Sequence, residues 1–204
     1  MSRIDFKNEY RSLYSAGRDF GLVEVPPLSY LMYDGHGDPN TAPVYAQAVE
    51  ALYSLSYTLK FMSRRAFGRD YVVGPLEGLW WAADMKAFSR REKAKWSWTL
   101  MILQPGWILP EHVAAAKAEV LMKKGLPGLE KARLETLEEG LCAQALHIGS
   151  YDDEGPILAR LHEAWLPAQG LVANGRHHEI YLGDPRKVEA ARLRTILRQP
   201  VRRA

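Results

Sequence analysis

The sequence has few of the features that mark disulfide-bonded, membrane-spanning or exported proteins. Its 204 residues include a single cysteine, Cys142, so an intramolecular disulfide is impossible. No uninterrupted apolar run approaches the roughly 18 residues that a membrane-spanning helix needs. The N-terminal segment MSRIDFKNEYRSLY is polar and charged, unlike a signal peptide. These absences predict a cytoplasmic protein without a membrane partner.

Charge and histidine spacing argue against two further classes of protein. The formal net charge of +3 comes partly from the SRREKAK run and the RQPVRRA tail, and no helix-turn-helix pattern or basic helix with interleaved aromatics is present. We therefore expect no nucleic-acid partner. His177 and His178 are adjacent and diverge on a strand, and the other histidines are scattered, so no metal site is expected. The segment DGHGD lacks the lysine of a phosphate-binding loop, and we expect no cofactor.

The first half of the chain reads as strand, helix, strand, strand. A strand over residues 28–34 ends in a Gly/Asp/Pro/Asn turn, and a helix with apolar residues at helical spacing begins at Pro43. The segments YVVGPLEGLWW and WSWTLMILQP are rich in β-branched and aromatic residues, as strands are, and a charged connection over residues 83–95 separates them. A helix in EHVAAAKAEVLMKKG, ended by Gly125, leads to the second half.

The second half repeats this order. RLETLEEGLCAQALHIGSYDDEG predicts a strand and a turn, with Cys142 as a buried structural thiol; a nucleophile is the alternative. A helix runs from Pro156 to near Gly170, and HHEIYLGDP predicts a strand. Both halves carry a turn with Gly and Asp before a proline at the helix start. Chance similarity is the alternative to duplication, because two strand–turn–helix units look alike at this level of detail.

We therefore predict an α+β fold made of two strand-helix-strand-strand modules in one domain over residues 1–204. The first repeat covers about residues 20–105, a connecting helical segment about 106–133, and the second repeat about 134–204. Two such modules would be related by a pseudo-twofold axis. A groove along that axis is the expected place for a ligand.

Strand alternation selects the first candidate site residues. Glu179 and Tyr181 share one face of HHEIYLGDPRK, and Glu77 and Trp81 share one face of LEGLWW with Trp80 opposite. Carboxylates among aromatic rings suit a planar, apolar, cationic or electron-poor ligand, and burial would raise the pKa of such a carboxyl. The alternative for Glu179 is a position in solvent or a pair with a nearby arginine.

Four tryptophans are candidate site residues, and each has core packing as its alternative. Adjacent strand residues face opposite ways, so only one residue of the Trp80–Trp81 pair can line a given face, and Trp81 is favoured because it shares the face of Glu77. Trp98 and Trp107 are candidate walls of the ligand groove, with core packing as the alternative for each.

Four segments, in order, closely resemble the stand-alone GyrI-like small-molecule-binding proteins, which are relatives of the effector-binding domains of multidrug-sensing transcription regulators. They are LSYLMYDGHGDPN, PLEGLWW, LHIGSYDDEGP and HHEIYLGDPRK, and the resemblance runs from about Val23 to the LRTILRQPV tail. It implies a pseudo-symmetric pair of modules that form an aromatic groove with a buried glutamate at its centre. It also implies a free-standing receptor or enzyme.

The resemblance further implies a chemistry. Some members of the family are hydrolases that open the cyclopropane ring of cyclopropanoid cyclohexadiene natural products, a class of DNA-alkylating antibiotics. Such hydrolases are expected to use two glutamates, and Glu154 and Glu179 match those positions best. One glutamate would deprotonate water, and Tyr181, Tyr33 or Tyr151 could hydrogen-bond the substrate carbonyl. Which glutamate is the base stays open.

Three functions are compatible with this pattern. The first prediction is a hydrolase of strained, planar aromatic electrophiles that serves detoxification. The second is a non-catalytic module that binds or sequesters planar or cationic aromatic drugs. The third and weakest is an inhibitor of DNA gyrase by protein contact. The oligomeric state stays open between monomer and homodimer.

Overall fold

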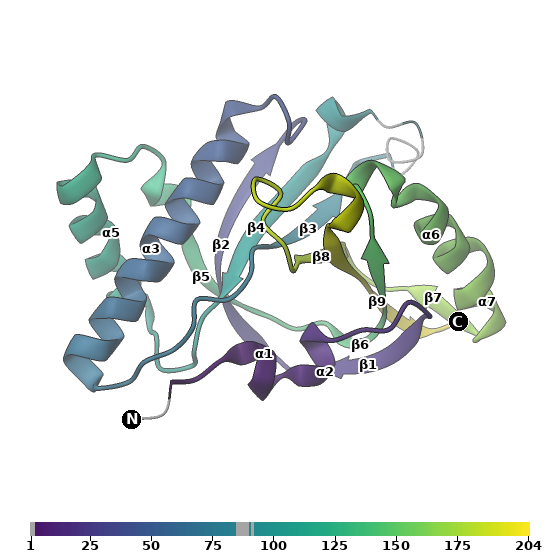
Figure 1. The fold of residues 1–204 in the computed structure, drawn as a ribbon, viewed down its shortest axis with the longest axis horizontal. Helices are drawn as coiled ribbons and strands as arrows, with labels where there is room; N and C mark the ends of the chain where they lie inside the picture. The colour runs from purple at the N-terminus through teal and green to yellow at the C-terminus, as the bar shows by residue number, and fades with distance from the viewer. Residues whose placement is uncertain (1–2, 85–89, 91) are drawn as a thin grey trace. The chain divides into compact units, whose positions relative to one another are not determined.

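The computed structural model describes residues 3–84, 90 and 92–204, which form two compact units (Figure 1). The first unit comprises Met1–Glu9 and Leu28–Leu137, and the second comprises Tyr10–Pro27 and Glu138–Ala204. Residues 85–89 and 91 of the charged connection expected over residues 83–95 lie outside the described part. Among the helices of the described part, none is long and apolar enough to cross a membrane.

The first unit is an antiparallel sheet covered by two long helices. Its strands lie in the order β3-β4-β2-β5. Its elements are α1 (Phe6–Glu9), β2 (Leu28–His36), α3 (Pro43–Phe67), β3 (Glu77–Trp81), η1 (Lys93–Lys95), β4 (Ser97–Leu103), α5 (Pro110–Lys124), η2 (Leu129–Lys131) and β5 (Arg133–Leu137).

The long helix α3 forms where the sequence predicts it. Pro43 occupies its first turn, where the missing N–H costs nothing, and Gly68 ends it with a left-handed φ of 63°. Leu52 and Leu59 of its apolar stripe are fully buried. The helix packs on β2 and β4, and α5 packs beside it (Figure 1). The stripe thus forms the core between helix and sheet.

The second unit is also an antiparallel sheet with helices. Its strands lie in the order β1-β6-β9-β8, and β7 pairs with the end of β9. Its elements are α2 (Arg11–Tyr14), β1 (Gly21–Val25), β6 (Gly140–Ile148), η3 (Tyr151–Asp153), α6 (Gly155–Arg160), η4 (Leu161–Trp165), α7 (Leu166–Ala168), β7 (Leu171–Ala173), β8 (His177–Tyr181), η5 (Ala190–Arg192) and β9 (Arg194–Arg203).

The helix expected from Pro156 onward is continuous but irregular. Its middle, η4, is a π-helical turn between α6 and α7, and we call residues 155–168 the helical segment. In a π-helix the backbone hydrogen bonds span five residues instead of four. Leu161 and Leu166 are five residues apart, and both pack with Ala143 and Val201 of the sheet. The helical segment therefore covers one face of the second sheet.

The mixed helix and sheet composition of the predicted fold is confirmed, with two differences in the strands. The stretch from Arg133 to Ile148 forms two strands, because the chain turns at Gly140 with a left-handed φ of 63°. The ten-residue strand β9 was missed, since arginines interrupt its apolar pattern and its end was taken as a basic tail. In the first unit β2 is followed by a helix and by β3 and β4, and in the second unit β6 is followed by the helical segment and, after the short strand β7, by β8 and β9. In each unit the last of these strands lies between the other two, as β4 does between β3 and β2 and β9 between β8 and β6. Duplication and symmetry stay predictions.

Cys142 is buried on β6, as the structural interpretation predicted. Burial, together with the nearby charge of Glu139, raises the pKa of its thiol to about 12. The thiol is therefore protonated at neutral pH and unsuited to act as a nucleophile.

A buried ionic network lies on the face of the second sheet opposite the helical segment. Arg198 of β9 is 1% exposed and donates hydrogen bonds to Gln144 (3.2 Å) and to the backbone carbonyl of Leu13 (2.6 Å). Glu139 lies 3.6 Å from the Arg198 guanidinium and 3.0 Å from His178 Nδ1. Burial alone would raise the pKa of Glu139, but the charges of His178 and Arg198 outweigh it and hold that pKa below its usual value.

Removing the carboxylate of this network is expected to destabilise the fold strongly. Glu139→Gln leaves the positive charge of Arg198 buried and uncompensated, which costs about 3–5 kcal/mol. Chemical denaturation at pH 7 measures this loss. The matched control is Glu138→Gln, because Glu138 is exposed in the same turn; equal effects of the two substitutions would contradict a role for the network.

The first unit yields a second stability prediction at Gly35. A Cβ atom there would lie 2.0 Å from the ring of Trp98, which is fully buried. Gly35→Ala must displace that ring, and we expect a loss of about 1–3 kcal/mol in the free energy of unfolding. Gly106→Ala is the control because nothing lies within 4 Å of its added Cβ. An unchanged stability of Gly35→Ala would show that the ring is not fixed.

Candidate functional site

Glu179 lies on the face of the second sheet that the helical segment covers. It is paired with Leu197, and Leu197 is paired with Ala145, so their side chains leave the sheet on one face. Ala143 is two residues from Ala145, shares that face and packs against the helical segment. Tyr181 is two residues from Glu179 and also shares it. The alternation predicted for this strand is thus present, and its polar residues face the helices.

Glu154 lies at the start of the helical segment, directly before α6, and is 5% exposed. Burial raises the pKa of its carboxyl well above the usual value of 4.5. The negative charge of Glu179 raises it further, and so does the hydrogen bond between the two side chains. A hydrogen bond between two carboxyls needs a proton on one of them. Glu154 is therefore the protonated member of a carboxyl pair with Glu179.

Two aromatic side chains surround Glu179. The Tyr181 hydroxyl donates a hydrogen bond of 2.8 Å to Glu179 Oε2, and the Tyr151 ring meets the Tyr181 ring edge-on at 5.5 Å. Burial, followed by the charges of Glu179 and Glu154, raises the pKa of Tyr151 to about 12. This phenol thus stays protonated at neutral pH. The structure brings together four of the predicted site residues: Glu154, Glu179, Tyr181 and Tyr151.

Two residues beside this group were not predicted. His177 is on the face of Glu179, and its Nε2 lies 3.6 Å from Glu179 Oε1. Alternation in HHEIY could have identified His177. Thr195 of β9 is opposite Tyr181, fully buried, and close enough to Glu154 to offset part of the rise in its pKa. No sequence signal pointed to Thr195, because its strand was missed.

Glu77 lies on the face of the first unit's sheet that is turned away from the helices of that unit. Trp80 faces α3, where its ring stacks at 6.4 Å from Tyr45. Glu77 and Trp81 share the opposite face, as alternation predicted. Glu77 is fully buried there and accepts a hydrogen bond of 3.4 Å from Tyr30, while Trp81 is half-buried. A ligand contact by Glu77, Trp80 or Trp81 stays a prediction.

The remaining aromatic candidates of the first unit, which are Trp98, Trp107 and Tyr33, are buried in the protein or hydrogen-bonded to other parts of it. Trp98 is fully buried and donates a hydrogen bond of 3.2 Å to the carbonyl of Gly37. Trp107 donates one of 2.9 Å to Ser63 at the end of α3. Tyr33 is fully buried in β2. Such contacts are expected if Trp98 and Trp107 pack in the core, which was the alternative to lining a ligand groove.

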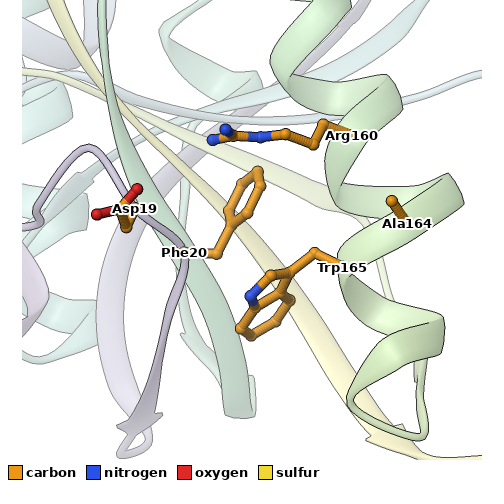
Figure 2. Close-up of a pocket in the computed structure, with 5 residues that line it drawn as sticks. All are labelled: Asp19, Phe20, Arg160, Ala164 and Trp165. Carbon is orange, nitrogen blue, oxygen red and sulfur yellow. The ribbon is translucent and has the colours of Figure 1, made fainter.

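A cavity of about 300 Å³ lies elsewhere in the second unit (Figure 2). The Arg160 guanidinium lies over the Phe20 ring at 4.8 Å, and the Trp165 ring is 5.5 Å from Phe20. Its lining consists of Asp19, Phe20, Arg160, Ala164 and Trp165. The carboxyl pair is thus not part of this cavity. Residues 3–84, 90 and 92–204 contain no cluster of three or more side chains that could hold a metal ion.

Comparison with known proteins identifies the fold. The family model of the GyrI-like small molecule binding domain matches residues 19–202. The chain belongs to the GyrI-like family. As a GyrI-like protein it carries a small-molecule-binding domain, and the resemblance read from its four sequence motifs is confirmed.

Solved structures agree with this assignment. An uncharacterized conserved protein from Listeria innocua is 35% identical, with a TM-score of 0.90 over 98% of this GyrI-like chain and 100% of that chain. A hydrolase from Listeria innocua is also 35% identical, with a TM-score of 0.86 and the same coverage. The EcmrR C-terminal domain is 12% identical, with a TM-score of 0.56 over 91% of this chain and 98% of that chain, which shows the fold alone. No curated protein matches.

The carboxyl pair of this GyrI-like domain should give its stability a distinct pH dependence. Folded Glu154 keeps its proton above pH 4.5, where the unfolded chain releases it, so the wild type loses stability as pH rises from 4.5 to the raised pKa. Glu154→Gln lacks this loss. We therefore expect the free energy of unfolding of the variant, minus that of the wild type, to increase over this range.

Denaturant titrations from pH 4 to 8 measure that difference. Glu50→Gln is the control, because Glu50 is exposed on α3 in the other unit. Parallel curves for Glu154→Gln and the wild type would show that Glu154 does not hold a proton in the folded state.

Proposed function

We propose that this GyrI-like protein is a hydrolase of strained, planar aromatic electrophiles, which it detoxifies by opening a cyclopropane ring of the cyclopropanoid cyclohexadiene type with water. The observation that carries this proposal is the buried carboxyl pair, in which Glu154 holds a proton next to the negative charge of Glu179. A 35% identical protein of the same fold is a hydrolase, which supports the reaction class.

Such a pair suits the addition of water to an electron-poor ring. The water oxygen forms a bond to the cyclopropane carbon, and the strained carbon–carbon bond breaks. Its electron pair moves into the conjugated ring and onto the carbonyl oxygen, which becomes a phenol by taking a proton. Water loses one proton and the substrate oxygen gains one, so the reaction needs no oxidant, reductant or external acid.

The carboxyl pair can move that proton. The negative charge of Glu179 draws a proton from the attacking water, directly or through Glu154, while a neutral carboxyl or phenol supplies a proton to the substrate oxygen. We assign this second role to Tyr181, because its hydroxyl contacts Glu179 at 2.8 Å. The pair starts and ends each cycle with one proton. Burial and the negative charge of Glu179 raise the pKa of Glu154 and so favour that proton on Glu154.

A non-catalytic binding module is the second candidate function. Aromatic rings beside a carboxylate attract cations, and the Tyr151 and Tyr181 rings lie next to Glu179. In such a module Glu179 would hold a cationic or electron-poor aromatic drug without chemical change. The two functions differ in whether product forms.

The test is turnover of a cyclopropapyrroloindole-type electrophile, followed as the water-opened product by mass-resolved chromatography. We expect Glu154→Gln and Glu179→Gln each to lower the rate by about 10²–10⁴-fold, because each removes a proton-transfer group. Binding of the electrophile should change little. Glu163→Gln is the control, since Glu163 is an exposed carboxylate on the helical segment.

Two results would favour the binding module. The first is tight binding with no product above the rate in buffer alone. The second is a Glu179→Gln variant whose main defect is weaker binding of cationic aromatics.

A further inference from the structure

The cavity of the second unit has two aromatic walls that the hydrophobic core holds in place. Phe20 and Trp165 are half-buried, and both pack against the buried cluster that contains Leu161 and Leu166. Their ring centres are 5.5 Å apart (Figure 2). The cavity that they border has a volume of about 300 Å³, which is within the range of small-molecule sites. Its walls are therefore fixed enough to receive a ring.

The π-helical turn brings the wall residues of the helical segment together. In a regular α-helix each residue turns by about 100°, so Arg160 and Trp165, five positions apart, would point about 140° apart. With the π-helical turn Leu161–Trp165 between them, both line the cavity, and so does the small residue Ala164. Such turns are rare and are frequently found at functional sites.

Arg160 brings an unpaired positive charge to this cavity. Its guanidinium carbon lies 4.8 Å from the centre of the Phe20 ring. Within residues 3–84, 90 and 92–204, no side chain or carbonyl accepts a hydrogen bond from this group or pairs with its charge. A guanidinium that stacks on a ring keeps its N–H donors, and a carboxylate can accept two of them at once. The group is thus available to a negatively charged ligand.

We propose that this cavity binds a small planar aromatic carboxylate. Its ring lies against Phe20 and Trp165, and its carboxylate accepts hydrogen bonds from Arg160. The positive charge of Arg160 opposes the cationic ligands expected beside Glu179, so the two sites of the second unit prefer opposite charges. This second site does not involve the carboxyl pair and does not depend on the proposed hydrolysis.

Asp19 also lines the cavity, and its negative charge opposes such a ligand. Asp19 is exposed, so water and salt screen its charge. Arg160 and Asp19 therefore allow two substitutions with opposite expected effects on the binding of one anion.

The test is isothermal titration of the full chain with naphthoate and with its neutral amide, naphthamide. We expect naphthoate to bind more tightly than naphthamide. Arg160→Gln should weaken naphthoate about 10-fold and abolish the preference for the acid, because charge-assisted hydrogen bonds are lost. Asp19→Asn should strengthen naphthoate about twofold at low salt and leave naphthamide unchanged. The control is Arg192→Gln, since Arg192 is an exposed arginine of η5 outside the cavity lining.

A cavity-filling variant tests where the ring binds. Ala164 is exposed, so Ala164→Leu can be accommodated in the fold while its larger side chain occupies the cavity. We expect it to weaken naphthoate and naphthamide alike. Circular dichroism of each variant shows whether it is folded.

Three results would overturn the proposal. The first is no binding of naphthoate by the wild type. The second is equal naphthoate affinity of Arg160→Gln, Ala164→Leu and the wild type. The third is naphthoate binding that Glu179→Gln changes and Arg160→Gln does not, which would place the ring at the carboxyl pair.

Discussion

The guanidinium of Arg198 is a positive charge enclosed within the second unit, and the strands around it are held to one arrangement by the need to neutralise it. Glu139 supplies the opposite charge. Gln144 and the carbonyl of Leu13 accept hydrogen bonds from the Arg198 guanidinium. Arg198 is paired with His178 on β8, and both contact Glu139. A slip of one residue between these strands would put the two side chains on opposite faces of the sheet, so that Glu139 could contact only one of them. The ionic network therefore fixes the register of β8 and β9.

That register determines what the opposite face can carry. With His178 and Arg198 directed toward Glu139, the neighbouring residues Glu179 and Thr195 are directed toward the helical segment and Glu154. The two faces shift the pKa of a buried carboxyl in opposite directions. Cations hold the pKa of Glu139 down, whereas burial and a second carboxylate hold the pKa of Glu154 up. One sheet thus stabilises an ionised glutamate on one side and a protonated glutamate on the other.

The sequence predicts the parts of this arrangement that depend on local patterns. The helix from Pro43 is predictable because its apolar spacing and proline are local, and so is the shared face of Glu179 and Tyr181. The pairing of Glu154 with Glu179 came from the family resemblance, since residues 25 positions apart are brought together only by the folded sheet and helix. Thr195 was not predictable without β9. Arg198 breaks the apolar pattern of that strand, and its burial depends on partners distant in the sequence.

The π-helical turn of the helical segment has a consequence for how this chain can change in length. In a regular α-helix each residue turns by about 100°, so side chains five positions apart point in different directions, while those four apart lie on one face. Leu161 and Leu166 are five apart and are buried at 0% and 2% exposure in the same cluster. Removing one exposed residue between them would leave an ordinary helical turn with both leucines still on the buried face. Glu154 before the turn and the chain after it would keep their orientation, so this turn is where a relative can be one residue shorter without rotating the site.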